Sequence, residues 1–300
     1  MPSPATPKPS ASSGVTLRDG KMLSVAAMDR LSRQQDTTLV VLVGPPDSGK
    51  TTLVSSIYEQ VRATKIPGLW FTGSQTLMAF EERCHLSRLA SNLEEPATER
   101  TKYSEEQTFY HLRTRSEEPP HPLTELFLFD VAGEGFRELS TTHDACRRLD
   151  ALGRADYLAV LLDGKRLTNP RTRYLAIEEC INFLQCAKDS NAMANDCEVQ
   201  VVVSKSDELP ADAGKKLLPE IEAFIRQRLA DQYPKLVFAH VAARPESKSP
   251  LEHAHGVAAI LKYWTAARPG PAIQLDEPDL AGAKREAEAF GHREPPSSTP

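Results

Sequence analysis

The sequence predicts an α/β fold of three layers, in which helices cover both faces of a mostly parallel central sheet. Two observations lead to this expectation. Short, continuous apolar runs rich in β-branched residues, such as residues 39–43, alternate along the chain with segments of helical periodicity. Uninterrupted apolar runs are typical of strands that are buried on both faces. Their alternation with helices is typical of parallel sheets built from crossover connections.

The apolar runs predict five buried strands, at residues 39–43, 126–129, 157–162, 199–203 and 236–241. Residues 108–115 alternate apolar and polar side chains, which predicts an exposed strand. Helical periodicity predicts helices over residues 51–63, 74–90, 173–187 and 251–267. A further helix is expected to begin at Pro219, because proline suits the first helical position. Ser74 suits the N-cap of its helix.

Composition divides the chain into one domain and two tails. Residues 1–14 are rich in Pro, Ser, Thr and Ala, and residues 269–300 carry many Pro, Glu and Gly. Such segments lack the apolar residues of a core, so we expect both tails to be disordered. Residues 15–268 then form a single domain, with a helical insertion at about residues 67–99.

Charge and cysteine content narrow the class of partner and the compartment. The 300 residues carry a net charge of -5, which argues against nucleic acid, since a phosphate backbone requires a basic face. No stretch approaches the roughly 20 apolar residues of a membrane-spanning helix. The five cysteines have no zinc-ligand spacing, which favours reduced thiols in a cytoplasmic protein.

The strongest motif is Gly44-Pro-Pro-Asp-Ser-Gly-Lys-Thr51, which follows the first buried strand and precedes the first helix. It matches the phosphate-loop pattern G-x-x-x-x-G-K-[ST], and it therefore predicts the three-layer P-loop NTPase fold. In such a loop backbone N–H groups hold phosphate, the lysine reaches the terminal phosphates, and the final hydroxyl ligates Mg²⁺. The candidate phosphate and magnesium residues are Gly44, Asp47, Ser48, Gly49, Lys50, Thr51 and Thr52.

A second motif, Asp130-Val-Ala-Gly133, follows the strand at residues 126–129. An aspartate at the carboxyl end of a parallel strand suits a carboxylate that supports Mg²⁺, so Asp130 is a metal candidate. Gly133 would let a backbone N–H approach a γ-phosphate without an intervening side chain. The alternative is an ordinary strand-ending turn, since Asp and Gly both favour turns.

A third motif, Ser204-Lys-Ser-Asp207, follows the strand at residues 199–203 and bears on the identity of the base. The Asp207 carboxylate can accept hydrogen bonds from both N1 and N2 of guanine, whereas adenine offers no such pair of donors. The Lys205 stem can pack on the base while its ammonium stays in a polar environment. The alternative is a polar loop without a ligand.

The order and spacing of the three motifs resemble the TRAFAC-class GTPases, which are Ras-like in the broad sense. The guanine motif of that class reads [NT]-K-x-D, so Ser204 replaces its first residue, which implies weaker bracing of the phosphate loop. The class also places a backbone amide against the guanine carbonyl oxygen. The matching stretch is Ala242-Ala-Arg244, in which Ala243 is the candidate.

More narrowly, the chain looks like the bacterial double-GTPase group of GTPase-associated systems. The resemblance covers about residues 15–265. It rests on the phosphate loop, on Phe71-Thr-Gly-Ser-Gln-Thr-Leu77 with the following Phe80-Glu-Glu-Arg-Cys-His85, and on Asp130-Val-Ala-Gly-Glu134.

The resemblance also implies the residues of hydrolysis. A threonine of a mobile loop closes over Mg²⁺ and the γ-phosphate in this class, and Thr101 is the first candidate, with Thr98 the second. Ras-like proteins carry a water-orienting Gln after D-x-x-G, where this chain has Glu134. An anionic side chain near the γ-phosphate predicts slow hydrolysis that needs a partner. Arg137 and Arg100 are candidates for neutralising developing charge, and the favoured alternative for both is an ordinary surface arginine.

These residues lead to three hypotheses. The first is a switch that binds GTP with Mg²⁺, hydrolyses it slowly and signals its state to a protein partner through the inserted segment. The second is a scaffold that GDP or GTP stabilises without turnover. The third is an ATP-using P-loop kinase or NTPase. The position of Asp207 shortly after Lys205 argues against this third hypothesis.

Overall fold

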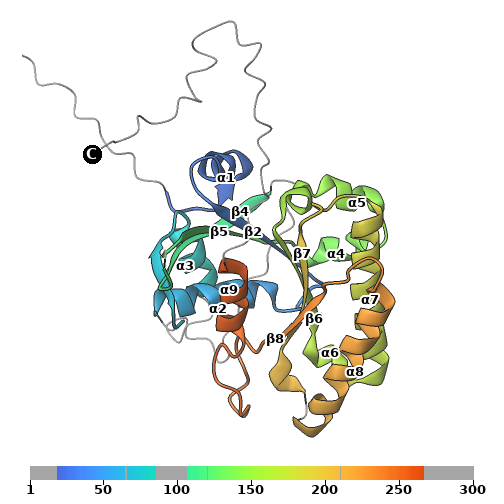
Figure 1. Cartoon of the computed structure of the whole chain (residues 1–300). Helices are drawn as coiled ribbons and strands as arrows, with labels where there is room; N and C mark the ends of the chain where they lie inside the picture. The colour runs from blue at the N-terminus through green and yellow to red at the C-terminus, as the bar shows by residue number, and fades with distance from the viewer. Residues whose placement is uncertain (1–18, 65, 86–106, 120, 210, 267–300) are drawn as a thin grey trace, which may run out of the picture. The chain divides into compact units, whose positions relative to one another are not determined.

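A computed structural model describes residues 19–64, 66–85, 107–119, 121–209 and 211–266 of the chain. The tails that we expect to be disordered, residues 1–14 and 269–300, lie outside this part. In Figure 1 helices lie on either side of a central sheet, which is the α/β arrangement that the sequence predicts.

Within the described residues the sheet has eight strands, seven of them in the order β1-β4-β5-β2-β6-β7-β8, and β3 also pairs with β4. From β5 to β8 every neighbouring pair is parallel, while β4 is antiparallel to β5, β1 and β3. The strands are β1 (Leu23–Ser24), β2 (Thr37–Val43), β3 (Leu69–Gly73), β4 (Thr108–Ser116), β5 (Leu123–Asp130), β6 (Tyr157–Asp163), β7 (Glu198–Ser204) and β8 (Val237–His240). The expectation of a mostly parallel sheet is therefore confirmed.

Helices cover both faces of this sheet. One face carries α2 (Lys50–Arg62), α3 (Leu77–His85) and α9 (Val257–Thr265), and the other carries the helices from α4 to α8 (Figure 1). The latter are α4 (Phe136–Leu139), α5 (His143–Arg148), α6 (Gly164–Thr168), α7 (Pro170–Asp189) and α8 (Ala211–Leu229), and α1 (Val25–Ser32) precedes β2. None of the helices described is both long and apolar enough to cross a bilayer.

Two apolar cores lie on the two faces of the sheet, and they explain why residues 39–43 of β2 are all apolar. Val41 belongs to the core beneath α7 and α8, whereas Val40 and Leu42 belong to the core beneath α2, α3 and α9. All three side chains are fully buried. A strand with helices on both sides favours a continuous apolar run, because both of its faces are removed from water.

β4 differs from its prediction as an exposed strand, because its side chains are mostly buried. The strand lies between β5 on one side and β1 and β3 on the other, so both of its edges are paired. Two of its polar residues, His111 and Arg113, share one partner. Glu125 of β5, which is fully buried, accepts hydrogen bonds from Arg113 and from the His111 ring.

Three helix boundaries also differ from the prediction. Pro219 lies inside α8, although an internal proline removes a helical hydrogen bond. α9 begins at Val257 and not at residue 251, because Gly256 before it has a left-handed backbone (φ 77°). Ser74 does not cap α3, because α3 begins at Leu77 and the Ser74 hydroxyl accepts from the N–H of Thr76, which precedes the helix.

The described part of the predicted insertion consists of β3 and α3. The Phe80 ring of α3 stacks on Tyr58 of α2 with ring centroids 4.6 Å apart, and it also contacts Tyr110 of β4. The Tyr58 hydroxyl donates a hydrogen bond to Glu81. These contacts attach α3 to the helix that begins at the phosphate loop.

Candidate functional site

The described candidate residues gather at the carboxyl ends of the parallel strands. Loops that follow β2, β5, β6, β7 and β8 meet at this edge of the sheet, and ligands of open α/β sheets bind there. Thr101, Thr98 and Arg100 lie outside the described residues, so the candidates for closing the site are not placed.

The phosphate loop connects β2 to α2. Asp47 and Gly49 have positive φ angles of 60° and 86°, which turn the chain sharply into the helix. Gly49 is the N-cap of α2, and glycine adopts this left-handed conformation without steric cost. Pro45 and Pro46 have no N–H, so any anion must bind to donors from the later part of the loop and from the first turn of α2.

The Lys50 ammonium lies inside the curve of this loop. Its Nζ donates to the carbonyl oxygens of Gly44 and Pro45 at 2.7 and 3.0 Å. Burial lowers the pKa of Lys50. Three nearby carboxylates oppose this shift, in decreasing order those of Asp130, Glu134 and Asp47.

Thr51 and Asp130 provide an oxygen pair beside the loop. The Thr51 hydroxyl donates to the Asp130 carboxylate at 2.7 Å, and Asp130 is buried at the end of β5. A hydroxyl and a carboxylate are the oxygen donors that Mg²⁺ accepts in phosphate sites, where water and phosphate complete the coordination. No group of three His, Cys, Asp or Glu side chains in the described residues could hold a metal ion by itself. Thr51 and Asp130 therefore fit a magnesium site in which phosphate and water supply the remaining ligands.

Gly133 lies against the phosphate loop. A Cβ atom at this position would come within 2.6 Å of the Pro46 nitrogen, so no larger residue fits without displacing the loop. Glu134 follows in a short 3-10 turn and is exposed, as is Arg137.

Ser204 ties the phosphate loop to the loop after β7. Its hydroxyl donates to the Ser48 carbonyl oxygen at 2.7 Å, and both residues are buried. With Ser in place of Asn or Thr, the chain thus retains a direct hydrogen bond to the phosphate loop. A serine hydroxyl is long enough because β7 ends close to the loop.

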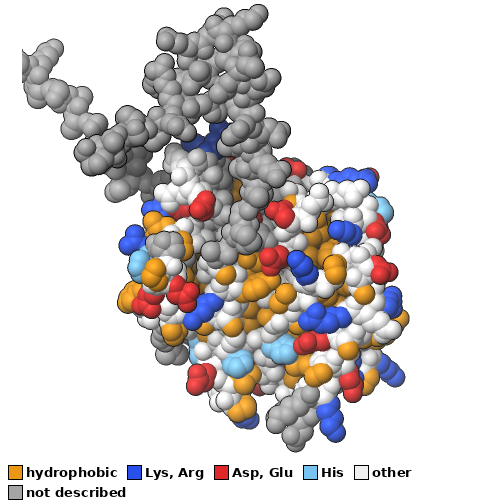
Figure 2. All heavy atoms as spheres, viewed as in Figure 1, with side chains coloured by type: hydrophobic (Ala, Val, Ile, Leu, Met, Phe, Trp, Pro, Cys, Tyr) orange, Lys and Arg blue, Asp and Glu red, His pale blue; other side chains and the backbone are white. Residues whose placement is uncertain are grey.

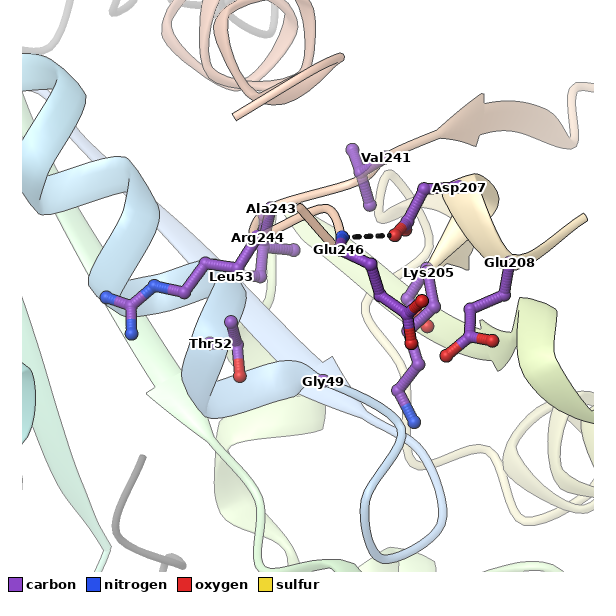
Figure 3. A pocket seen from close by; sticks show the side chains of 11 residues that line it. Gly49, Thr52, Leu53, Lys205, Asp207, Glu208, Val241, Ala243, Arg244 and Glu246 are labelled. Carbon is purple, nitrogen blue, oxygen red and sulfur yellow. Dashed lines mark hydrogen bonds between the residues drawn. The ribbon is translucent and has the colours of Figure 1, made fainter. Parts of the chain in front are cut away.

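A pocket of about 220 Å³ opens beside this brace (Figure 3). The first residues of α2 form one side, and loops after β7 and β8 form two walls. The lining residues are Gly49, Thr52, Leu53, Ser204, Lys205, Asp207, Glu208, Val241, Ala243, Arg244 and Glu246. The third predicted motif and Ala243 are therefore brought together with the end of the phosphate loop.

Two residues of this pocket are held by contacts that the sequence did not predict. The Lys205 ammonium lies 3.0 Å from the buried Asp163 carboxylate at the end of β6. The Asp207 carboxylate accepts a hydrogen bond from the Glu246 N–H. Asp163 could have been suspected, because it is an acidic residue that directly follows a buried strand. Glu246 lies in a polar loop with no distinguishing pattern.

The fold and this pair of adjoining sites define a P-loop nucleotide-binding protein. A family model described as Double-GTPase 2 matches residues 38–265, which is most of the chain. The chain belongs to this family of GTPases. No curated protein sequence matches it.

Solved structures also resemble the chain, at low sequence identity and low TM-score. The crystal structure of bacterial selenocysteine-specific elongation factor EF-Sec is 16% identical, with a TM-score of 0.35 over 69% of this chain. Elongation factor SelB from Methanococcus maripaludis, in complex with the GTP analogue GPPNHP, is 14% identical, with a TM-score of 0.34 over 69%. This chain spans only 26% and 30% of those two chains. The signal recognition particle receptor complex SRb-GTP/SRX from Chaetomium thermophilum is 15% identical, with a TM-score of 0.37 over 71% of this chain and 93% of that one.

Proposed function

We propose that this protein is a guanine-nucleotide switch, which binds GTP with Mg²⁺, hydrolyses it slowly and passes its nucleotide state to a protein partner. The observation that carries the proposal is the junction at Ser204. The hydrogen bond from Ser204 to Ser48 joins two features. The phosphate loop lies on one side of it, and the pocket with the Asp207 carboxylate lies on the other. A nucleotide with its phosphates on one side and its base on the other fits this arrangement.

In the phosphate subsite, the N–H groups of residues 47–52 and the Lys50 ammonium would hold the phosphates. Lys50 would exchange its carbonyl partners for phosphate oxygens, which are the stronger acceptors because they are charged. Thr51 and Asp130 would hold Mg²⁺. When bound, the ion neutralises charge on the phosphate oxygens during phosphoryl transfer.

In the base subsite, Asp207 would accept from N1 and N2 of guanine, and the Lys205 stem would lie against the ring. The Ala243 N–H would donate to the guanine carbonyl oxygen. Ser56 of α2 donates to the Ala243 carbonyl at 3.3 Å, which steadies that peptide. Adenine would leave the Asp207 carboxylate without two donors, and an unpaired polar group in a site costs binding energy.

Slow, partner-dependent hydrolysis is proposed from Glu134. This exposed carboxylate follows Gly133 and is close enough to influence the Lys50 ammonium. It can accept a hydrogen bond from an attacking water, but its charge repels a γ-phosphate. Thr101 stays the proposed residue that closes over the γ-phosphate and Mg²⁺.

Signalling through the insertion is proposed from the contact between α3 and α2. Because α2 begins at Lys50, a movement of the phosphate loop would reach α3 through the Tyr58–Phe80 stack. Phe80 is fully buried, so deletion of the whole insertion would open the core. Met78 of the same helix is exposed by 53% and offers a partner a surface that can be altered without this damage.

Thermal unfolding in the presence of nucleotides tests the proposal, because a ligand that binds only the folded state raises the midpoint. GDP and a non-hydrolysable GTP analogue with Mg²⁺ should stabilise the wild type, and an ATP analogue should not. Asp207→Asn should lose the response to GDP and gain one to xanthosine diphosphate, because its amide can donate to the 2-oxo group. Equal stabilisation by ATP would contradict the assignment of the base and favour the kinase hypothesis. Stabilisation by GDP with no phosphate release from GTP would favour the scaffold.

A further inference from the structure

The two walls of the base pocket are joined across the pocket by a hydrogen bond to Asp207. The backbone N–H of Glu246, in the loop after β8, donates to Asp207 Oδ2 at 2.9 Å, although the two residues are 39 positions apart (Figure 3). Deeper in the structure, the Ser206 N–H donates to the Val241 carbonyl oxygen at 3.0 Å. The two loops therefore meet at two points, and only the outer one uses the side chain that we assign to guanine.

A carboxylate that recognises two neighbouring N–H groups must present both oxygens at once. An aspartate side chain on a partly exposed loop rotates about its bonds, and in most rotamers it would offer one oxygen at the required angle. The bond from Glu246 holds one oxygen and so restricts this rotation. Each carboxylate oxygen has two lone pairs, so Oδ2 can accept from Glu246 and from a guanine N–H together.

The chain before Glu246 adds rigidity to this contact. Pro245 fixes its own φ angle and leaves Glu246 as the next backbone donor. Ser56 holds the preceding Ala243 peptide, and Arg244 is held by Glu59 of α2 at 3.2 Å. The donor is thus carried by a loop that is attached to α2.

We propose that the backbone N–H of Glu246 is a positioning group, which orients Asp207 and thereby contributes to selectivity for guanine. This inference rests on the proposed function, because it concerns the same pocket. The side chain of Glu246 has no part in it. The group acts through Asp207 and touches no ligand atom.

Two substitutions at one position isolate the N–H. Glu246→Pro removes the donor, whereas Glu246→Ala keeps it and removes only the carboxylate. Affinities of the full chain for GDP and for inosine diphosphate, which lacks the 2-amino group, can be measured by calorimetry with Mg²⁺. We expect Glu246→Pro to weaken GDP about tenfold and inosine diphosphate much less, so that the ratio of the two affinities falls. Glu246→Ala should retain the wild-type ratio.

The outcomes separate this inference from the proposed function. A wild type that binds GDP and ADP equally would overturn both. A wild type selective for GDP, with an unchanged ratio in Glu246→Pro, would overturn this inference alone. If Glu246→Pro binds GDP and inosine diphosphate more weakly by the same factor, the N–H has a general structural role. If it binds GDP more tightly, the N–H competes with the base for Asp207. Either result also overturns this inference.

Hydrogen exchange provides a second measurement if Glu246→Pro does not fold. The Glu246 amide of the wild type should exchange slowly, both alone and with GDP, and at least about tenfold faster in Asp207→Ala. The same exchange rate in both proteins would overturn the inference.

Discussion

The Ser204 hydroxyl donates a hydrogen bond to the Ser48 carbonyl oxygen at 2.7 Å, across 156 residues of sequence. Ser48 belongs to the phosphate loop, and Ser204 ends the strand that leads to the base pocket. This hydrogen bond holds the two halves of the site at a fixed spacing. This spacing matches the function that we propose, since base and phosphates of one nucleotide are a fixed distance apart.

Removal of this brace should weaken both halves. Ser204→Ala should lower the free energy of unfolding by about 1–3 kcal/mol, because it removes a buried hydrogen bond. The same substitution should lower the affinity for GDP several-fold, because the phosphate loop is displaced. Urea unfolding and GDP titration measure the two effects, and Ser204→Thr, which keeps a hydroxyl, should restore both. If Ser204→Ala has the same free energy of unfolding as the wild type, this hydrogen bond does not stabilise the fold.

The oxygen pair of Thr51 and Asp130 predicts how nucleotide affinity depends on Mg²⁺. In EDTA, Thr51→Ala should bind GDP with the affinity of the wild type. Added Mg²⁺ should raise the affinity of Thr51→Ala for GDP about tenfold less than it raises that of the wild type, since one oxygen ligand is missing. Thr51→Ser retains the hydroxyl and should keep the gain. GDP titrations with and without Mg²⁺ measure it. An unchanged gain in Thr51→Ala would assign the ion to other ligands.

Strands and motifs could be predicted from the sequence because their causes are local. Residues 39–43 are apolar at every position, since α2 lies on one face of the strand and α7 on the other. The phosphate loop is equally local, because its glycines and Lys50 are contiguous. The prediction that a helix begins at Pro219 is wrong. It relies on the preference of proline for the first helical turn, whereas α8 continues through the proline, and Leu217 and Leu218 just before it pack against the core.

The contacts that complete the pocket could not be predicted in this way. Asp163 meets Lys205 only because β6 and β7 are neighbours in register, with Asp163 opposite Ser204. The bond from Glu246 to Asp207 uses a backbone donor, and every non-proline residue has one. Side-chain identity therefore carries no information about it. Positions of this kind follow from the arrangement of the loops.

The stack of Tyr58 on Phe80 predicts the stability of the insertion. Phe80→Ala should lower the free energy of unfolding by about 3–5 kcal/mol, because the ring is fully buried and its removal leaves a cavity. Met78→Ala on the exposed side of α3 should change it by less than about 0.5 kcal/mol. Urea unfolding compares the two. A small loss for Phe80→Ala would show that α3 is not part of the core, and it would remove the support for signalling through α2.

Buried thiols predict how stability depends on alkaline pH. Burial raises the pKa of Cys180 from its ordinary value of 9.0 to about 12. Between these two values the unfolded chain has lost the thiol proton while the folded chain retains it, so the folded state binds more protons and stability falls as pH rises. One such group contributes a slope of up to about 1.4 kcal/mol per pH unit.

Other groups titrate in the same range, so the comparison of wild type with Cys180→Ala isolates this one. The lowered pKa of Lys50 acts in the opposite direction, since there the unfolded chain keeps its proton longer. Urea unfolding from pH 8 to 11 should show that the wild type loses stability faster with pH than Cys180→Ala does. The two curves should run nearly parallel close to pH 8, where the thiol is mostly protonated in both states. Parallel curves over the whole range would mean that Cys180 ionises in the folded protein, and hence that water reaches the core between α7 and the sheet.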